Sequence, residues 1–208
     1  MVFFGTPEFA VPTLRSLIAG RHEVVAVVSQ PDRRRGRGRK TSPSPVARCA
    51  LDAELPILRP EKVGSPDVAE QLNACEPDLG VVVAFGQFLP RRIRELPQLG
   101  YLINGHASLL PRHRGAAPIA HAILAGDAET GISVMRVEKE MDAGPTALMK
   151  ATPIGEHETC GELTARLGEL TAVAIAEGLD AIADGRVQWT EQDDALATLA
   201  PKIERADA

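Results

Sequence analysis

The sequence predicts an α/β fold: an open, mostly parallel, Rossmann-like sheet with helices on both faces and an antiparallel extension. Short Val-rich runs, such as residues 23–29 and 79–84, are apolar almost throughout, as in strands buried on both faces of a parallel sheet. Stretches with helical apolar spacing separate these runs. After Gly131 two strand-like segments follow one another across a Gly-containing connection, which indicates an antiparallel pair.

The first part of the chain is expected to alternate strands with helices. Residues 2–4 are an apolar strand that ends at Gly5-Thr6-Pro7, and residues 9–18 are the next helix, which Gly20 closes. Further strands are expected at residues 23–29, 56–58, 79–84 and 101–106, and further helices at residues 46–55, 67–72 and 117–124. Such sheets bind ligands at the carboxyl ends of their strands, so a site is expected just after residues 4, 84 and 106.

The second part is expected to hold strands at residues 132–137 and 146–153 and a long amphipathic helix at residues 159–183. Thr159, with Glu162 three positions later, fits a capping box at the start of this helix. The residues that follow are polar, with a lone Trp189. We therefore expect one domain over residues 1–184 and a tail or linker over residues 185–208.

The composition excludes several classes of protein. The chain of 208 residues can bury a full hydrophobic core, and 44% apolar with 25% charged residues is typical of a globular domain. The longest apolar runs are too short to cross a bilayer and the start does not resemble a secretion signal, so a cytoplasmic chain without membrane contact is expected. The cysteines and histidines have no metal-ligand spacing, so no metal is expected.

One segment contrasts with the net charge of −5, which by itself argues against a general nucleic-acid binder. Six cations fall within eight residues: Arg33, Arg34, Arg35, Arg37, Arg39 and Lys40. Most charge runs of this kind are solvated surface. Beside an active site, however, a cationic segment can contact phosphates, and each contact adds a salt-sensitive increment of affinity.

The segment from Asn104 to Pro111 carries the clearest chemical signal, because it puts Asn104 and His106 at the end of a buried strand. Side chains two residues apart share one face of a strand. An amide that donates a hydrogen bond, beside an imidazole that can donate or accept a proton, suits a tetrahedral oxyanion. The spacing alone favours an Asn that caps a turn beside a structural His, because two residues do not make a site.

Longer motifs resemble the folate-dependent formyltransferase family, whose reacting motif is Asn-x-His-x-Ser-Leu-Leu-Pro with a distant Asp in an Asp-x-Gly turn. The chain has the first motif at residues 104–111 and the second at Asp142-Ala143-Gly144. The other matching segments are Phe4-Gly5-Thr6-Pro7-Glu8-Phe9-Ala10, Gln30-Pro31-Asp32, Val83-Ala84-Phe85-Gly86-Gln87-Phe88-Leu89-Pro90, Arg114-Gly115-Ala116-Ala117-Pro118 and Ala125-Gly126-Asp127-Ala128-Glu129-Thr130-Gly131. Their number and order make the resemblance specific.

The resemblance implies an enzyme that transfers the formyl group of 10-formyltetrahydrofolate to the α-amino group of methionyl initiator tRNA. It implies that Asn104 donates to the oxyanion, that His106 donates to the oxyanion and protonates the leaving nitrogen, and that Asp142 holds His106 cationic and relays a proton through a water. Folate contacts are expected from Ser108, Leu109, Leu110, Pro111, Phe85, Gly86, Gln87 and Leu89. Contacts with tRNA are expected from the six cations of residues 33–40.

Within the family, the Gly-Thr-Pro start and the basic segment resemble the members that act on tRNA rather than on glycinamide ribonucleotide. His113 departs from the usual Trp or Tyr, and Ala143 from the common Thr. The family's tRNA enzyme continues into a β-barrel domain, so residues 185–208 are expected to lead towards such a domain, without which tRNA affinity is expected to be weaker. A monomer is expected.

Three alternatives stay open on the sequence. A sister activity on a glycinamide ribonucleotide or sugar nucleotide would not need the basic segment. A Rossmann-type nicotinamide- or nucleotide-binding module is disfavoured because Gly5-Thr6-Pro7 lacks the G-x-G-x-x-G spacing. A non-catalytic RNA-binding protein would not need Asn104, His106 and Asp142. Arg112 and Arg114 could serve either folate carboxylates or tRNA.

Overall fold

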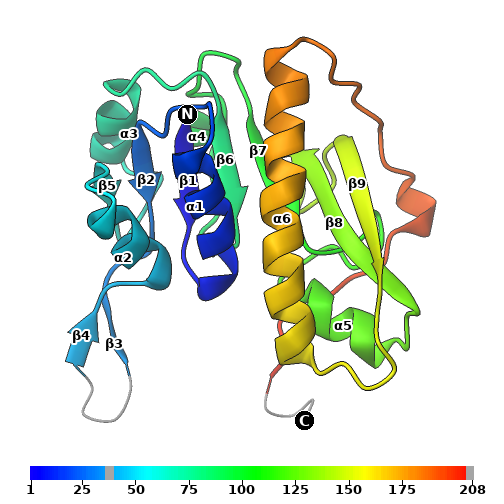
Figure 1. Ribbon diagram of the computed structural model, residues 1–208. Coiled ribbons are helices and arrows are strands. Elements are labelled where there is room, and N and C mark those ends of the chain that lie inside the picture. Colours follow the sequence, from blue (N-terminus) through cyan, green and yellow to red (C-terminus); the bar gives the residue numbers. More distant parts are fainter. Residues whose placement is uncertain (36–39, 205–208) are drawn as a thin grey trace. The chain divides into compact units, whose positions relative to one another are not determined.

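The computed structural model of the chain describes residues 1–35 and 40–204. The chain divides into two compact units, residues 1–103 and residues 104–208 (Figure 1). The chain passes from one unit to the other within strand β7 (Leu102–His106).

The first unit is built on parallel strands. β1 (Val2–Gly5) pairs with β2 (Ala26–Val28) on one side and with β6 (Gly80–Val83) on the other, and β2 pairs with β5 (Ile57–Leu58). All of β1, β2 and β6 is buried, as their uninterrupted apolar sequences predict. Strand β2 is shorter than the expected 23–29, because only its last residues follow the register of β1.

Helices follow these strands in the predicted order (Figure 1). They are the short 3₁₀ helix η1 (Glu8–Ala10) and the α-helices α1 (Val11–Ala19), α2 (Pro45–Asp52), α3 (Pro66–Asn73) and α4 (Arg91–Arg94). Helix α2 begins where the sequence favours it: the Ser44 hydroxyl accepts from the Ala47 amide, and Pro45 occupies the first turn. The short helix α4 was not predicted, because one helical turn shows too little apolar periodicity.

The basic segment contains two short strands that were not predicted from the sequence. Arg33–Arg35 (β3) and Lys40–Ser42 (β4) pair antiparallel, in the register of Arg35 opposite Lys40. A run of charged residues has no apolar alternation, so the sequence carried no strand signal here. Residues 36–39 lie outside the described part of the chain.

The second unit contains β8 (Glu129–Arg136) and β9 (Thr146–Pro153), which pair antiparallel as predicted. Its helices are α5 (Pro118–Leu124), the long α6 (Cys160–Ala183) and the 3₁₀ helix η2 (Asp194–Leu196). The capping box of Thr159 and Glu162 is confirmed at the start of α6. With the parallel strands of the first unit, this antiparallel pair confirms the predicted fold class.

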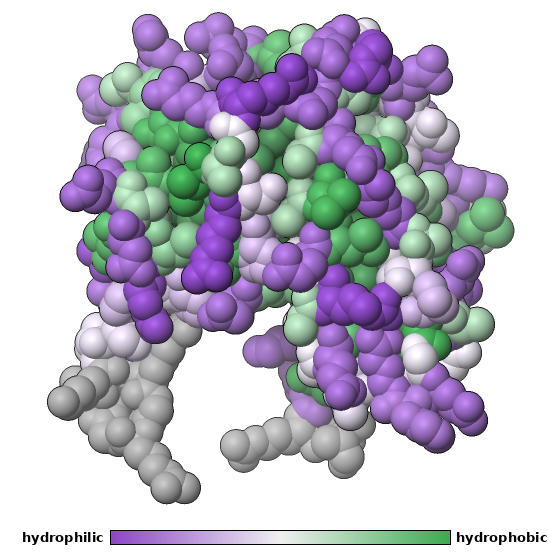
Figure 2. All heavy atoms as spheres, in the orientation of Figure 1, coloured by the Kyte–Doolittle hydropathy of each residue, from purple (hydrophilic) through white to green (hydrophobic). Residues whose placement is uncertain are grey.

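Apolar burial holds α6 in place. Leu163, Leu167 and Ile175 are fully buried, as are Ile132 and Val134 on β8. Each large side chain removed from water contributes about 1.5–3 kcal/mol to folding. Hydrophilic side chains cover much of the face seen in Figure 2, with hydrophobic patches among them. Within the described ranges, no helix is long and apolar enough to span a membrane.

The segment after α6, expected as a tail or linker, follows the second unit closely. Thr190 and Thr146 exchange backbone hydrogen bonds, and the Arg136 guanidinium lies 4.5 Å from the centre of the Trp189 ring. Further along, the Ala200 amide donates to the Arg114 carbonyl. The described residues 185–204 are thus tied to this unit by hydrogen bonds. The domain boundary at residue 184 stays a prediction.

Candidate active site

Asn104 and His106 lie on β7, with Gly105 between them. A Cβ atom at Gly105 would lie 2.7 Å from Cγ2 of Thr171 and 3.3 Å from Ile175, both on α6. The middle position of the Asn-x-His motif therefore faces the helix and leaves no room for a side chain. Because side chains alternate along a strand, Asn104 and His106 share the opposite face, as predicted.

Both ring nitrogens of His106 face polar groups of the protein. Nε2 lies 2.9 Å from the carbonyl oxygen of His113, and Nδ1 lies 3.6 Å from Oδ2 of Asp142. A carbonyl only accepts hydrogen bonds, so Nε2 carries a proton in this arrangement. A second proton, on Nδ1, would point towards the Asp142 carboxylate. The ring itself is only 6% exposed.

Asp142 reaches this position from the connection between β8 and β9. Its backbone has a φ of 52°, a left-handed conformation that Asp tolerates better than most residues. Oδ2 accepts a hydrogen bond of 2.9 Å from the amide of Gly115. A side chain at Gly144 would collide with the carbonyl of Arg136, which explains the glycine of the Asp-x-Gly turn. The fold thus brings Asp142 and His106 together, which no sequence spacing could establish.

Hydrogen bonds connect the Ser-Leu-Leu-Pro segment, residues 108–111, to β8. The Ser108 hydroxyl donates to the carbonyl of Arg112 at 2.6 Å. The Ser133 hydroxyl donates to the Ser108 carbonyl at 2.7 Å and accepts from the Leu110 amide at 3.0 Å. Ser108 and Leu110 are buried, whereas Leu109 and Pro111 are partly exposed. Within this segment of four expected folate residues, Leu109 and Pro111 therefore offer the more accessible side chains.

The other expected folate segment, Phe85 to Leu89, belongs to the first unit. The carbonyl of Phe85 accepts from the Thr6 hydroxyl at 2.8 Å and from the side-chain Nε2 of Gln30 at 3.2 Å. The same Nε2 donates to the Gly86 carbonyl at 3.0 Å. The Gln87 side chain bonds to the backbone of Pro60 and Val63. Phe85 and Leu89 are buried.

A surface hollow of about 760 Å³ adjoins this segment. Its lining includes Gly86, Gln87 and Phe88, whose side chain is 70% exposed. The polar side chains of Gln30 and Lys62 also line it. The hollow therefore combines apolar surface with charged side chains of both signs, since Glu61 and Arg33 line it as well. Lys62 lies in none of the family motifs, so its place beside this hollow was not predicted.

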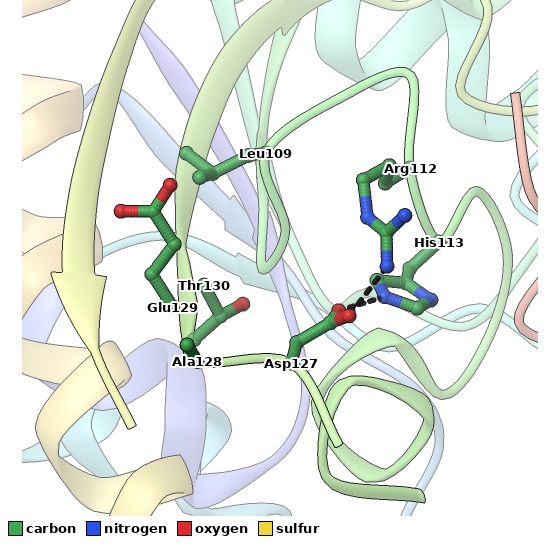
Figure 3. Close-up of a pocket in the computed structure, with 7 residues that line it drawn as sticks. All are labelled: Leu109, Arg112, His113, Asp127, Ala128, Glu129 and Thr130. Atoms are coloured by element: carbon green, nitrogen blue, oxygen red, sulfur yellow. Dashed lines mark hydrogen bonds and ion pairs between the residues drawn. The ribbon is translucent and has the colours of Figure 1, made fainter. Parts of the chain in front are cut away.

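A second, smaller cavity of about 160 Å³ lies in the second unit. Figure 3 shows Arg112 and His113 pointing at the carboxylate of Asp127. His113 Nε2 lies 2.6 Å from Oδ2 of Asp127, and the Arg112 guanidinium donates to Oδ1. Arg114 instead bonds to Gln192 and Asp194. Both arginines whose roles were open are thus ion-paired within the protein.

The expected tRNA residues are only partly described. The Arg33 guanidinium donates to Oε1 of Gln30 at 3.3 Å. Arg34, Arg35 and Lys40 lie on β3 and β4, but their side chains are outside the described part, as are Arg37 and Arg39 entirely. Among the described residues, no cluster of three His, Cys, Asp or Glu side chains could hold a metal ion.

Comparison with known proteins identifies the family. The model of the formyl transferase family matches residues 1–179. The chain is 47% identical over 208 residues to a methionyl-tRNA formyltransferase of Pseudomonas syringae pv. tomato, and 50% identical to one of Methylococcus capsulatus. Both alignments cover 100% of this chain. They cover 66% of the Pseudomonas protein and 67% of the Methylococcus protein. The chain therefore spans about two thirds of the length of these relatives.

Solved structures share the fold at lower identity. An N-formyltransferase from Helicobacter canadensis, in complex with folinic acid and dTDP-3-aminofucose, matches with a TM-score of 0.75 and 16% identity, covering 100% of this chain and 71% of that one. A phosphoribosylglycinamide formyltransferase from Bacillus halodurans matches with a TM-score of 0.72 and 22% identity, covering 87% and 93%. With the family model matching most of its length, this chain belongs to the formyl transferase family.

Proposed function

We propose that this chain transfers the formyl group of 10-formyltetrahydrofolate to the α-amino group of methionyl initiator tRNA, in the cytoplasm and as a monomer. The approach of Asp142 to His106, at 3.6 Å, carries the proposal. It supplies a carboxylate–imidazole pair beside the strand-end Asn104. The named relatives support the choice of acceptor, because they align over the whole of this chain.

The reaction does not require a nucleophilic side chain of the protein, because the substrate amine is the nucleophile. The α-amine of an aminoacyl ester has a pKa of about 8 or lower, so much of it is neutral near pH 7–8 and attacks the formyl carbon directly. As the new C–N bond forms, the carbonyl electron pair moves to oxygen and gives a tetrahedral oxyanion. The oxyanion then collapses, the bond from carbon to the folate nitrogen breaks, and that nitrogen gains a proton while the former amine loses one.

The three polar residues divide this work. The Asn104 amide donates to the oxyanion, which would be worth about 2.7–4 kcal/mol of barrier in a water-excluded site. His106 donates a proton from the Nδ1 edge of its ring, since the carbonyl of His113 occupies Nε2. The separation of 3.6 Å to Asp142 exceeds a hydrogen bond, so a water or substrate atom can share that edge. Asp142 stabilises the imidazolium and takes up the amine proton through a water.

Two segments are proposed to contribute folate contacts. They are Ser108-Leu109-Leu110-Pro111, and Phe85-Gly86-Gln87 with Leu89. The Phe85 carbonyl already accepts two hydrogen bonds, from Thr6 and Gln30. We therefore assign the polar recognition by this segment to the backbone of residues 87–89 rather than to Phe85.

The six cations of residues 33–40 are proposed to contact phosphates of the tRNA. Each phosphate contact releases counterions, so affinity should fall steeply as salt rises. A mononucleotide acceptor would need far fewer cations. This difference separates the proposed acceptor from a glycinamide ribonucleotide or sugar nucleotide.

The test compares formyl transfer to initiator methionyl-tRNA and to glycinamide ribonucleotide. In one variant the six cations of residues 33–40 become Ser; in a control, the exposed Arg91 and Arg92 of α4 become Ser. We expect the first variant to raise KM for tRNA at least about tenfold and to flatten its salt dependence, with the control little changed. Faster transfer to glycinamide ribonucleotide by the native chain, or no effect of the six substitutions, would contradict the proposal.

A further inference from the structure

Gln192, in the segment after α6, makes hydrogen bonds with every polar atom of its side chain. Its Nε2 donates to the carbonyl of Asp142 at 2.8 Å and to the carbonyl of Gly144 at 2.7 Å. Its Oε1 accepts from Nε and Nη2 of Arg114, at 3.0 and 2.8 Å. One amide thus connects the turn that carries Asp142 to the residue preceding Gly115.

The orientation of this amide follows from its partners. Carbonyl oxygens only accept, so the nitrogen must face Asp142 and Gly144, and a guanidinium only donates, so the oxygen must face Arg114. A carboxylate at this position could keep the bonds from Arg114 but could not donate to the turn. The two halves of the side chain can therefore be tested separately.

The turn needs such support. Asp142 has a left-handed backbone, with a φ of 52°, and lies in a connection between two strands rather than within one. Its carboxylate is held by the amide of Gly115, while its backbone is held by Gln192. Gly115 follows Arg114, whose guanidinium donates a hydrogen bond to Oε1 of the same Gln192. Gln192 is thus one of the two anchors of Asp142, and it also contacts the residue next to the other anchor.

We propose that Gln192 is a positioning residue for catalysis: it holds the 142–144 turn so that the Asp142 carboxylate stands against His106. The proposal rests on the proposed function of that pair. A displacement of about 1 Å at a reacting group can cost on the order of 100-fold in rate.

The experiment compares Gln192→Glu with Gln192→Met and with a matched control. Gln192→Glu keeps the acceptor for Arg114 and removes the donors to the turn, whereas Gln192→Met removes both. The control is Asp194→Asn, which changes another partner of Arg114 but leaves the turn contacts in place. Asp194 is 82% exposed, so its replacement should not disturb folding.

We expect Gln192→Glu and Gln192→Met to lower kcat for formyl transfer about 10- to 100-fold, with KM for both substrates changed less than about threefold. Asp194→Asn should match the native chain. In an Asp142→Asn background, Gln192→Glu should cost less than about threefold, because the residue it positions is already disabled. A loss that persists in this background, or native kcat in Gln192→Glu, would overturn the proposal.

A crystal structure of Gln192→Met separates failure of this inference from failure of the proposed function. If the native chain transfers no formyl group to methionyl-tRNA, the proposed function fails, but the position of Asp142 can still be measured. We expect the separation of His106 Nδ1 from Asp142 Oδ2 to grow by about 1 Å or more in the variant. An unmoved turn in that structure would refute the positioning role.

Discussion

Nδ1 of His106 lies 3.6 Å from Oδ2 of Asp142, although the two residues come from different elements of the second unit. His106 ends β7, and Asp142 stands in the connection between β8 and β9. Only 6% of the His106 side chain and 17% of the Asp142 side chain are exposed. Little water therefore separates the imidazole and the carboxylate from each other's electrostatic field.

This relationship predicts that His106 and Asp142 act as a unit. His106→Ala and Asp142→Asn should each lower kcat for formyl transfer by about 10²- to 10⁴-fold, the usual contribution of general acid–base groups. The double variant should lose little more than the worse single variant. Steady-state rates of the four proteins measure this, and a double loss equal to the product of the single losses would show that the residues act independently.

The contact between Gly105 and α6 predicts the cost of a methyl group on β7. Gly105→Ala should lower the free energy of unfolding by about 1–3 kcal/mol, because the new Cβ would press on Cγ2 of the buried Thr171. Thr171→Ser removes that methyl group and keeps the hydroxyl that donates to the Leu167 carbonyl. Urea denaturation should therefore find the double variant more stable than Gly105→Ala alone. If Thr171→Ser gives no rescue, the clash lies elsewhere.

The two partners of the Asp127 carboxylate, His113 and Arg112, are expected to contribute unequally to the stability of the fold. Asp127→Asn should destabilise the fold by about 1.5–3 kcal/mol, because His113 is buried and loses a charge-assisted hydrogen bond. Arg112→Gln should cost no more than about 1 kcal/mol, because Arg112 is 50% exposed and well solvated. Thermal and urea denaturation of the two variants provide the comparison. Equal losses would mean that burial does not decide the strength of these pairs.

The loop before α6 predicts a dependence of stability on pH. Hydrogen bonds from Arg166, with a further one from the Gly155 amide, lower the pKa of Glu158 from 4.5 to about 2. Because the folded-state pKa is depressed, this stabilisation is fully present above pH 4.5 and is lost as pH falls towards 2. Glu158→Gln should therefore have a lower Tm than the native chain at pH 7, and the gap should close across that window.

A matched control for Glu158 is the exposed Glu156 in the same loop. Glu156→Gln should leave Tm nearly unchanged at both ends of the pH range, because surface substitutions usually stay within about 0.5 kcal/mol. A gap between native and Glu158→Gln that is constant from pH 7 to pH 2 would mean that the ion pair does not set the difference.

The sequence by itself determined the buried parallel strands, the long helix and the shared face of Asn104 and His106 on β7. Buried parallel strands are uniformly apolar, so β1 and β6 could be found without partners in view. The capping box of Thr159 is local chemistry within four residues, and Asn104 and His106 share a face because side chains alternate along any strand. Each of these features depends on neighbours in sequence, and sequence patterns carry that information.

Only the tertiary structure decided which distant residues meet. The approach of Asp142 to His106 depends on how β8 and β9 pair, and no spacing in the sequence measures that. The hold of Gln192 on the Asp142 turn lay in a polar segment expected to be a linker, because a hydrogen-bonding Gln looks the same in a sequence as a solvated one. Long-range polar contacts have no periodicity, and they become visible only when the chain is folded.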